Sequence, residues 1–142
     1  MTTTNEIGDW NQKIIEEFRA NEGRVGGMFE GALMILIHHI GARSGTERVT
    51  PLVYLPENDG HMVILASKAG APTNPDWYHN LKAHPAIDVE VGVETFPVVA
   101  TEAEGEERAE IWSRVVAANP GFDEYQQKTT RTIPVFVLTR TT

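Results

Sequence analysis

Cysteine is absent from this 142-residue sequence. Its absence excludes a disulfide scaffold, a thiol nucleophile, a cysteine-ligated zinc site and an iron–sulfur cluster. No apolar run approaches the roughly 20 residues that a membrane-spanning helix requires, and the first residues have neither the basic nor the apolar region of a signal peptide. We therefore expect a cytoplasmic protein.

Basic residues are also few, because 12 Lys and Arg stand against 20 Asp and Glu and give a formal net charge of −8. Nucleic acids and anionic membranes attract positively charged surfaces, so neither is an expected partner. The sequence has no His-Glu-x-x-His, Gly-x-Ser-x-Gly or Gly-x-Gly-x-x-Gly pattern. His38 and His39 are neighbours on an expected strand and point to opposite faces, so they cannot share a metal ion. No metal site is predicted.

The composition that is present, 41% hydrophobic and 23% charged residues, is typical of one folded domain, which we expect to span residues 1–142. An apolar stripe predicts a helix over Asp9–Arg19. Its members are Trp10, Ile14, Ile15 and Phe18. The mixed charges of the other face favour packing on the protein over contact with a membrane. The alternatives for this helix and the loop that follows it, within residues 1–30, are that they cover a ligand pocket or that they contact a lipid surface.

Six strands are expected, at residues 32–40, 48–55, 61–67, 87–91, 95–102 and 133–139. Short turns join the first three, Asn58-Asp59-Gly60 among them, which requires antiparallel pairing. Asn74 and Pro75 predict the start of a helix that ends near Ala83, and a further helix is expected over 106–118. Residues 122–130 are expected to form a polar connection. The pattern favours an antiparallel barrel with helices packed outside.

Two glycine-containing segments suggest a site for an anion. Arg43, Ser44 and Arg48 lie in the turn between the first two strands, where guanidinium, hydroxyl and backbone N–H groups can hold a phosphate. Lys68 follows the third strand and is placed to approach the same turn. The alternative is a charged turn with all three cations directed into solvent.

Two further segments carry aromatic residues. Trp77, Asn80 and Leu81 share one face of the helix that begins after Pro75. Trp77 either enters the core or flanks a planar ring at the helix start. Tyr125 offers a hydroxyl on the polar connection, where functional residues concentrate, and is otherwise a surface tyrosine.

Five segments in this order, residues 41–52, 66–71, 74–85, 107–112 and 125–135, resemble the deazaflavin-dependent nitroreductase family of actinobacteria. The resemblance covers about Leu33 to Leu138. It implies a split β-barrel related to the pyridoxamine-phosphate oxidases, and the cofactor coenzyme F420, an 8-hydroxy-5-deazaflavin with an anionic phospholactyl-polyglutamate tail. Such a tail gives the cationic turn a ligand.

The resemblance also implies roles for individual residues. The implied cofactor-binding residues are Arg43, Ser44, Gly45, Arg48, Val49, Thr50, Pro51, Leu52, Leu65, Ala66, Ser67, Lys68, Asp76, Trp77, Tyr78, His79 and Asn80. The implied catalytic residues are Tyr125 and Ser67, and the implied substrate pocket comprises Trp10, Phe18, Phe122 and Tyr125. Two positions depart from the family pattern. Ala42 replaces a second basic residue, and Phe122 replaces a pocket tyrosine.

The expected function is hydride transfer from reduced F420 to an electron-poor acceptor: a quinone, an activated enone or lactone, or a nitroaromatic compound. The cofactor supplies the reducing chemistry, and a proton comes from Tyr125, Ser67 or solvent. The alternatives are an FMN- or haem-binding barrel and a non-enzymatic deazaflavin-binding protein. Both a monomer and a homodimer are compatible with the sequence.

Overall fold

The computed structural model describes residues 3–27, 31–57, 60–67 and 73–141. Its helices are α1 (Thr3–Ala20), α2 (Asp76–Ala83), α3 (Gly105–Ala118) and α4 (Gly121–Gln127). Its strands are β1 (Met34–Ile40), β2 (Glu47–Val53), β3 (Leu55–Pro56), β4 (Met62–Leu65), β5 (Ala86–Val91), β6 (Glu94–Glu102) and β7 (Val135–Arg140). None of the helices in these ranges is long and apolar enough to cross a membrane.

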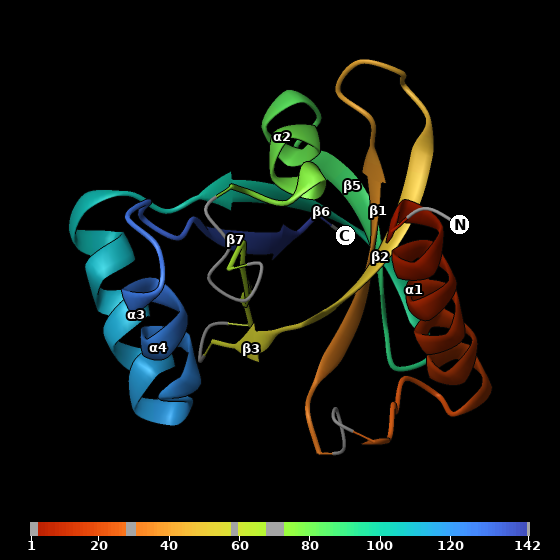
Figure 1. Ribbon diagram of the computed structural model, residues 1–142, viewed down its shortest axis with the longest axis horizontal. Coiled ribbons are helices and arrows are strands. Elements are labelled where there is room, and N and C mark those ends of the chain that lie inside the picture. The colour runs from red at the N-terminus through yellow and green to blue at the C-terminus, as the bar shows by residue number, and fades with distance from the viewer. Residues whose placement is uncertain (1–2, 28–30, 58–59, 68–72, 142) are drawn as a thin grey trace.

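The seven described strands form one antiparallel sheet in the order β2-β1-β5-β6-β7-β4-β3. The outermost strands of that order, β2 and β3, are separated in the chain by Tyr54 alone. One bent strand therefore supplies both margins, and the sheet curls into a half-barrel, as the path from β2 to β3 in Figure 1 shows. The predicted antiparallel barrel is confirmed. The expected strand 48–55 is divided because its two halves pair with different partners.

Alternation along β1 determines what each face of the sheet contacts. Ile35 and Ile37 are fully buried in the main core, which α2 covers with Trp77 and Leu81. Residues of the opposite parity, Met34 and Leu36, belong to a second cluster beneath α1. A third cluster packs β4 and β7 against α3. The chain thus has helices on two sides of a curved sheet (Figure 1).

The predicted N-terminal helix is confirmed, although α1 begins six residues before the expected Asp9. Three members of its apolar stripe, Ile14, Ile15 and Phe18, are buried against β1 and β2. Trp10 is 48% exposed. Packing on the protein, the favoured expectation for this helix, therefore accounts for most of the stripe.

Two helices differ from the expectation. Pro75, rather than Asn74, occupies the N-cap of α2, and its ring has no polar atom to form a side-chain capping bond. The side chain of Asn74 accepts a hydrogen bond from Arg131. The expected polar connection 122–130 is wrong, since α4 forms there. Phe122 and Tyr125, three residues apart, pack on the cluster beneath α3. That tertiary contact stabilises a seven-residue helix too short to form alone.

Candidate cofactor site

The turn between β1 and β2 has a defined backbone. The Gly41 N–H donates to the Thr46 carbonyl at 2.9 Å, and the Gly45 N–H donates to the Gly41 carbonyl at 2.9 Å. Gly45 has a φ of 69°, a left-handed conformation that favours glycine. Arg43 and Ser44 are exposed at this turn and Arg48 is exposed just after it. No carboxylate in the described ranges forms an ion pair with either arginine.

A buried polar network holds this turn against α2. The Ala42 N–H donates to Asn80 Oδ1 at 2.9 Å, Asn80 Nδ2 lies 2.8 Å from His39 Nδ1, and His39 Nε2 lies 2.8 Å from Thr50 Oγ1. Because Oδ1 accepts, the amide nitrogen of Asn80 must donate to Nδ1, which places the imidazole proton on Nε2. Nε2–H then donates to Thr50, whose hydroxyl hydrogen is left to donate elsewhere.

His39 is neutral in this network. Its ring is 2% exposed, and burial, helped by the charge of Arg48, lowers the pKa of His39 to about 4. The sequence pattern bears on His39 only as a metal ligand and does not reveal its role in this network. A single buried histidine gives no local signal for its partners.

Alternation along β2 divides the expected cofactor residues between two faces. Arg48, Thr50 and Leu52 pair with β1 residues whose side chains face α2 and the main core. Val49 and Pro51 have the opposite parity, and Val49 packs in the cluster beneath α1. The side chains of these two groups therefore do not meet in one pocket.

Tyr54 continues the series Arg48, Thr50, Leu52 at the same two-residue spacing and packs against the same core. Burial raises the pKa of Tyr54, so its phenol stays protonated and can donate a hydrogen bond. Tyr54 is not among the residues expected at the site, although the two-residue period of the strand, extended by one step, includes it.

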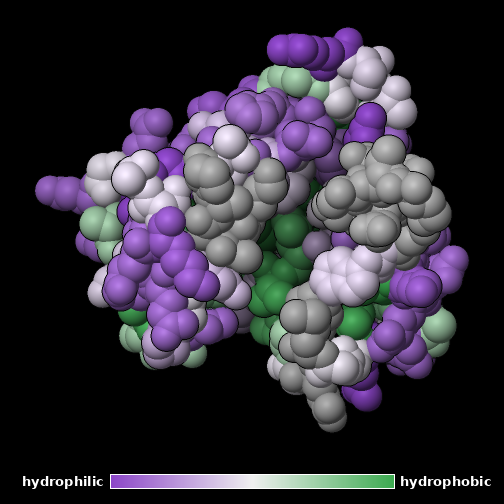
Figure 2. Space-filling model, in the orientation of Figure 1, coloured by the Kyte–Doolittle hydropathy of each residue, from purple (hydrophilic) through white to green (hydrophobic). Residues whose placement is uncertain are grey.

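An apolar hollow lies beside this series. Figure 2 shows hydrophobic residues lining a depression over the stretch where β2 bends into β3, with α1 on one side and α3 and α4 on the other. The partly buried hydrophobic residues of these elements include Leu52, Tyr54, Leu55, Phe122 and Tyr125. The depression is open to solvent on this face.

Helix α2 directs its expected residues in several directions. Trp77 is buried and its ring centroid lies 5.9 Å from that of Phe136, so the core position is the one observed. The Tyr78 hydroxyl donates to Glu102 on β6 at 3.4 Å. Asp76 and His79 are exposed. The predicted common face of Trp77, Asn80 and Leu81 is confirmed, because all three are buried.

The stretch after β4 supplies further expected residues. Leu65 and Ala66 are buried, and Ser67 is partly exposed. Lys68 and the hairpin residues Asn58 and Asp59 lie outside the described residues.

The expected substrate residues come from two helices. The rings of Phe122 and Tyr125 meet edge to face on α4 at 5.9 Å, and Lys128 Nζ lies 5.7 Å from the Tyr125 ring centroid. Phe18, at 1% exposed, is enclosed in the cluster beneath α1 and presents no surface to a ligand. Trp10 is the exposed aromatic residue of α1.

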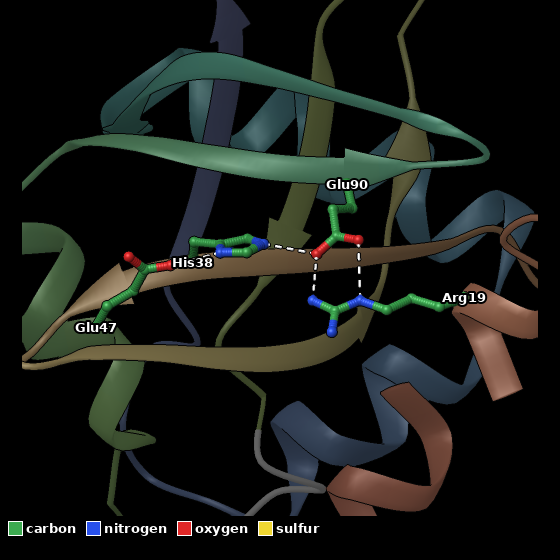
Figure 3. A network of polar contacts seen from close by, with 4 residues as sticks. All are labelled: Arg19, His38, Glu47 and Glu90. Carbon is green, nitrogen blue, oxygen red and sulfur yellow. Dashed lines mark hydrogen bonds and ion pairs between the residues drawn. The ribbon is translucent and has the colours of Figure 1, made fainter. Parts of the chain in front are cut away.

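The opposite face of β1 carries a charged network (Figure 3). His38 Nδ1 lies 2.6 Å from Glu47 and its Nε2 lies 2.7 Å from Glu90. Arg19 donates two hydrogen bonds to Glu90, at 3.1 and 2.7 Å. Burial alone lowers the pKa of His38, but the hydrogen bonds to the two carboxylates outweigh burial and raise it. His38 and His39 therefore face opposite sides of the strand, as predicted.

A depression of about 200 Å³ adjoins this network and is lined by His38, Glu47 and Asp88 among others. Its two carboxylates oppose an anionic ligand. In the part of the chain that the structure describes, no three His, Asp or Glu side chains are grouped to hold a metal ion.

The fold and the candidate site together are an antiparallel half-barrel with an exposed cationic turn and an apolar hollow. Residues 10–140 match the F420H(2)-dependent quinone reductase family. The chain belongs to this family.

Individual relatives agree. An F420H(2)-dependent quinone reductase of Mycobacterium tuberculosis (strain ATCC 25618 / H37Rv) is 39% identical over 127 residues, which cover 87% of this chain and 85% of that protein. The solved structure of an F420-H2 dependent reductase (FDR-A) is 44% identical, with a TM-score of 0.66, and covers 74% of this chain and 92% of its own. A solved structure described as a domain-swapped dimer is 37% identical, with a TM-score of 0.69. The match covers 96% of this chain and 99% of the chain in that structure.

Family membership confirms the expectation of an oxidoreductase that uses coenzyme F420. The FMN alternative is not supported. The split-barrel fold is also confirmed, because FDR-A shares it over most of its length.

Proposed function

We propose that this protein reduces quinones with reduced F420, and that the cofactor lies across the Arg43 turn and the apolar hollow. The observation that carries the proposal is the position of the turn. Exposed guanidinium groups without a carboxylate partner in the described ranges lie at and just after the turn that leads into β2, and the apolar depression lies where the same strand bends into β3, in a chain of net charge −8.

The residues of the turn fit the anionic part of F420. Arg43 and Arg48 offer two guanidinium groups, which bind phosphate and carboxylate oxygens through paired N–H donors. Ser44 offers a hydroxyl. The hydrogen bond from Ala42 to Asn80 holds the turn in place before the ligand binds, which lowers the entropy lost on binding. Ala42 itself carries no charge, so Arg43 and Arg48 supply the cations at this turn.

The apolar hollow fits the ring system and the acceptor. When bound, reduced F420 would supply the hydride for the acceptor. Leu52 and Leu55, on either side of the bend between β2 and β3, offer apolar surface, and Thr50 offers its hydroxyl hydrogen. A quinone that accepts a hydride also needs a proton at its oxygen. We assign that proton to Tyr125 or Ser67, with solvent as the alternative.

The aromatic residues of α4 bear on the choice of acceptor. Phe122 adds an apolar ring beside Tyr125 where the family pattern has a second hydroxyl, and this favours an acceptor with an apolar ring, such as a quinone. Nitroaromatic compounds and activated enones or lactones are the competing acceptors, and turnover with each should be compared with that of menadione.

We also propose that residues 1–142 form one domain and that the protein assembles as a homodimer. The support for the dimer is the relative described as a domain-swapped dimer, which aligns with 96% of this chain. Light scattering coupled to size exclusion measures the mass directly. Lipid contact has less support, because Ile14 and Phe18 of the apolar stripe are buried.

The first experiment is a fluorescence titration of the purified protein with F420, run in parallel with FMN. We expect saturable quenching with F420 and none with FMN, and anaerobic turnover of menadione with reduced F420. Arg43→Ala should weaken F420 binding by about tenfold, because one charged phosphate contact is lost. Arg24→Ala, which removes an exposed arginine outside the site, is the matched control. Tight FMN binding with no response to F420 would overturn the proposal.

A further inference from the structure

Arg131, between α4 and β7, joins two segments that flank the candidate site. Its Nη1 donates to the Ala66 carbonyl at 3.0 Å and to Asn74 Oδ1 at 2.8 Å. Its Nη2 donates to the Ser67 carbonyl at 2.8 Å. Ala66 and Ser67 follow β4, whereas Asn74 precedes α2. One guanidinium group therefore fixes the end of β4 to the start of α2.

The backbone that carries Arg131 is itself held from α4. Gln126 Nε2 donates to the Arg131 carbonyl at 2.7 Å, and Gln126 Oε1 accepts the Ile133 N–H at 2.9 Å. The Ala66 N–H donates to the Pro134 carbonyl at 3.0 Å. Contacts thus run without a break from the helix that bears Tyr125 to the backbone of Ser67.

The geometry of these contacts requires an arginine. Three acceptors on two segments need several N–H groups spread over a plane, which guanidinium provides and an ammonium group does not. All three acceptors are neutral, and burial lowers the pKa of Arg131, although an arginine stays charged in proteins. The partly buried guanidinium group of Arg131 is therefore a charged donor that several acceptors hold at once.

We propose that Arg131 is a positioning residue of the reductase site, which sets the place of Ser67 and of the start of α2 relative to Tyr125 through its bonds to Ala66, Ser67 and Asn74. The proposal rests on the proposed function. It gives Arg131 a role that does not require contact with the cofactor or the acceptor.

The test compares Arg131→Met and Arg131→Lys with Arg140→Met and Arg140→Lys. Arg140 is the matched control, because it is half-exposed on β7 and pairs with Glu94. Amide hydrogen exchange is measured first, without cofactor. Peptides that contain Ala66, Ser67 and Asn74 should exchange faster in Arg131→Met, while peptides of β5 and β6 should exchange as in the unmodified protein.

Kinetics form the second arm. Arg131→Met should lower kcat for menadione by about tenfold or more, with a smaller change in KM, because misplaced groups slow the chemical step more than they weaken binding. Arg131→Lys should recover part of the loss, since it restores a donor to one of the acceptors. A structural role alone would lower the melting temperature and leave kcat of the folded protein unchanged, which would overturn the proposal.

Asn74→Ala provides a milder variant if Arg131→Met does not fold. It removes one acceptor and should give a smaller change of the same kind in exchange and in kcat. Unchanged exchange and unchanged kcat in both Arg131→Lys and Asn74→Ala would refute the proposal. Failure of the proposed function would give a distinct result, because the unmodified protein would then not bind F420. Amide hydrogen exchange without cofactor would still report the effect of Arg131 on the backbone.

Discussion

Replacing His39 with Gln should remove a large part of the protein's loss of stability in acid. His39 is buried between Asn80 and Thr50, and its pKa is lowered from 6.5 to about 4. In the unfolded chain the same ring takes up a proton near pH 6.5. Between these two values the unfolded state binds a proton that the folded state does not, so the free energy of unfolding falls as the pH falls.

The magnitude follows from the difference between the two pKa values. Each unit corresponds to about 1.4 kcal/mol, so His39 should lower the free energy of unfolding by about 3 kcal/mol between pH 7 and pH 4. For a domain of marginal stability this is a large fraction of the total. Arg48 adds to the effect, whereas Asp76 opposes it.

The neighbouring His38 should act in the opposite direction. Its pKa is raised by Glu47 and Glu90, so its stabilising contribution is complete below pH 6.5 and is lost as the pH rises through its raised folded value. Two adjacent residues therefore make opposite contributions, because the strand directs one ring into the core and the other between carboxylates.

Urea denaturation at pH 4, 5, 6, 7 and 8 gives the free energy of unfolding of each variant and of the unmodified protein. The difference between the two at each pH isolates one histidine, because the contributions of the other titratable groups cancel. His39→Gln should reduce the fall in the free energy of unfolding on the acid side of its pH profile. His38→Gln should reduce the fall on the neutral-to-alkaline side. His84→Gln, at an exposed position, controls for the loss of a histidine. A His39→Gln curve parallel to that of the unmodified protein from pH 6.5 to 4 would refute the reasoning.

Three other substitutions test separate contacts. Asn80→Ala should destabilise the fold by about 2 kcal/mol, because it leaves buried His39 Nδ1 without a donor; urea denaturation beside Asn11→Ala checks it. Tyr125→Phe should lower kcat for menadione by roughly 100-fold and leave the Kd of F420 unchanged if the phenol supplies the proton; equal kcat values would transfer that role to Ser67 or solvent. Gly23→Ala should lower the melting temperature by several degrees, because the new Cβ would lie 2.7 Å from Gly92 Cα at a φ of +93°; an unchanged value would mean that the hairpin moves away freely.

The strands and the cationic turn are predictable because their signals are local. The apolar run at 32–40 indicates a buried strand, glycines indicate the turn, and short connections require antiparallel pairing. The closure of the sheet is not local. The strand pattern runs without a break from Arg48 to Leu55, and only tertiary pairing decides that the partner changes at Tyr54. Helix α4 escapes prediction for the same reason, because packing on α3, rather than its own periodicity, stabilises it.

The same distinction separates the groups that would bind a ligand from those that position them. Arg43, Ser44 and Arg48 lie within six residues of one another, whereas Asn80 is 41 positions from His39 and Arg131 is 64 positions from Ser67. The two positioning contacts share no residue, so their effects should combine independently. The F420 affinity lost in an Asn80→Ala/Arg131→Lys double variant should equal the sum of the single losses in free energy, to within about 0.5 kcal/mol. In Asn80→Ala/His39→Gln, whose residues belong to one network, the loss should be smaller than the sum. Strong coupling in the first pair would contradict this independence. It would mean that the turn between β1 and β2 and the backbone of Ser67 move together.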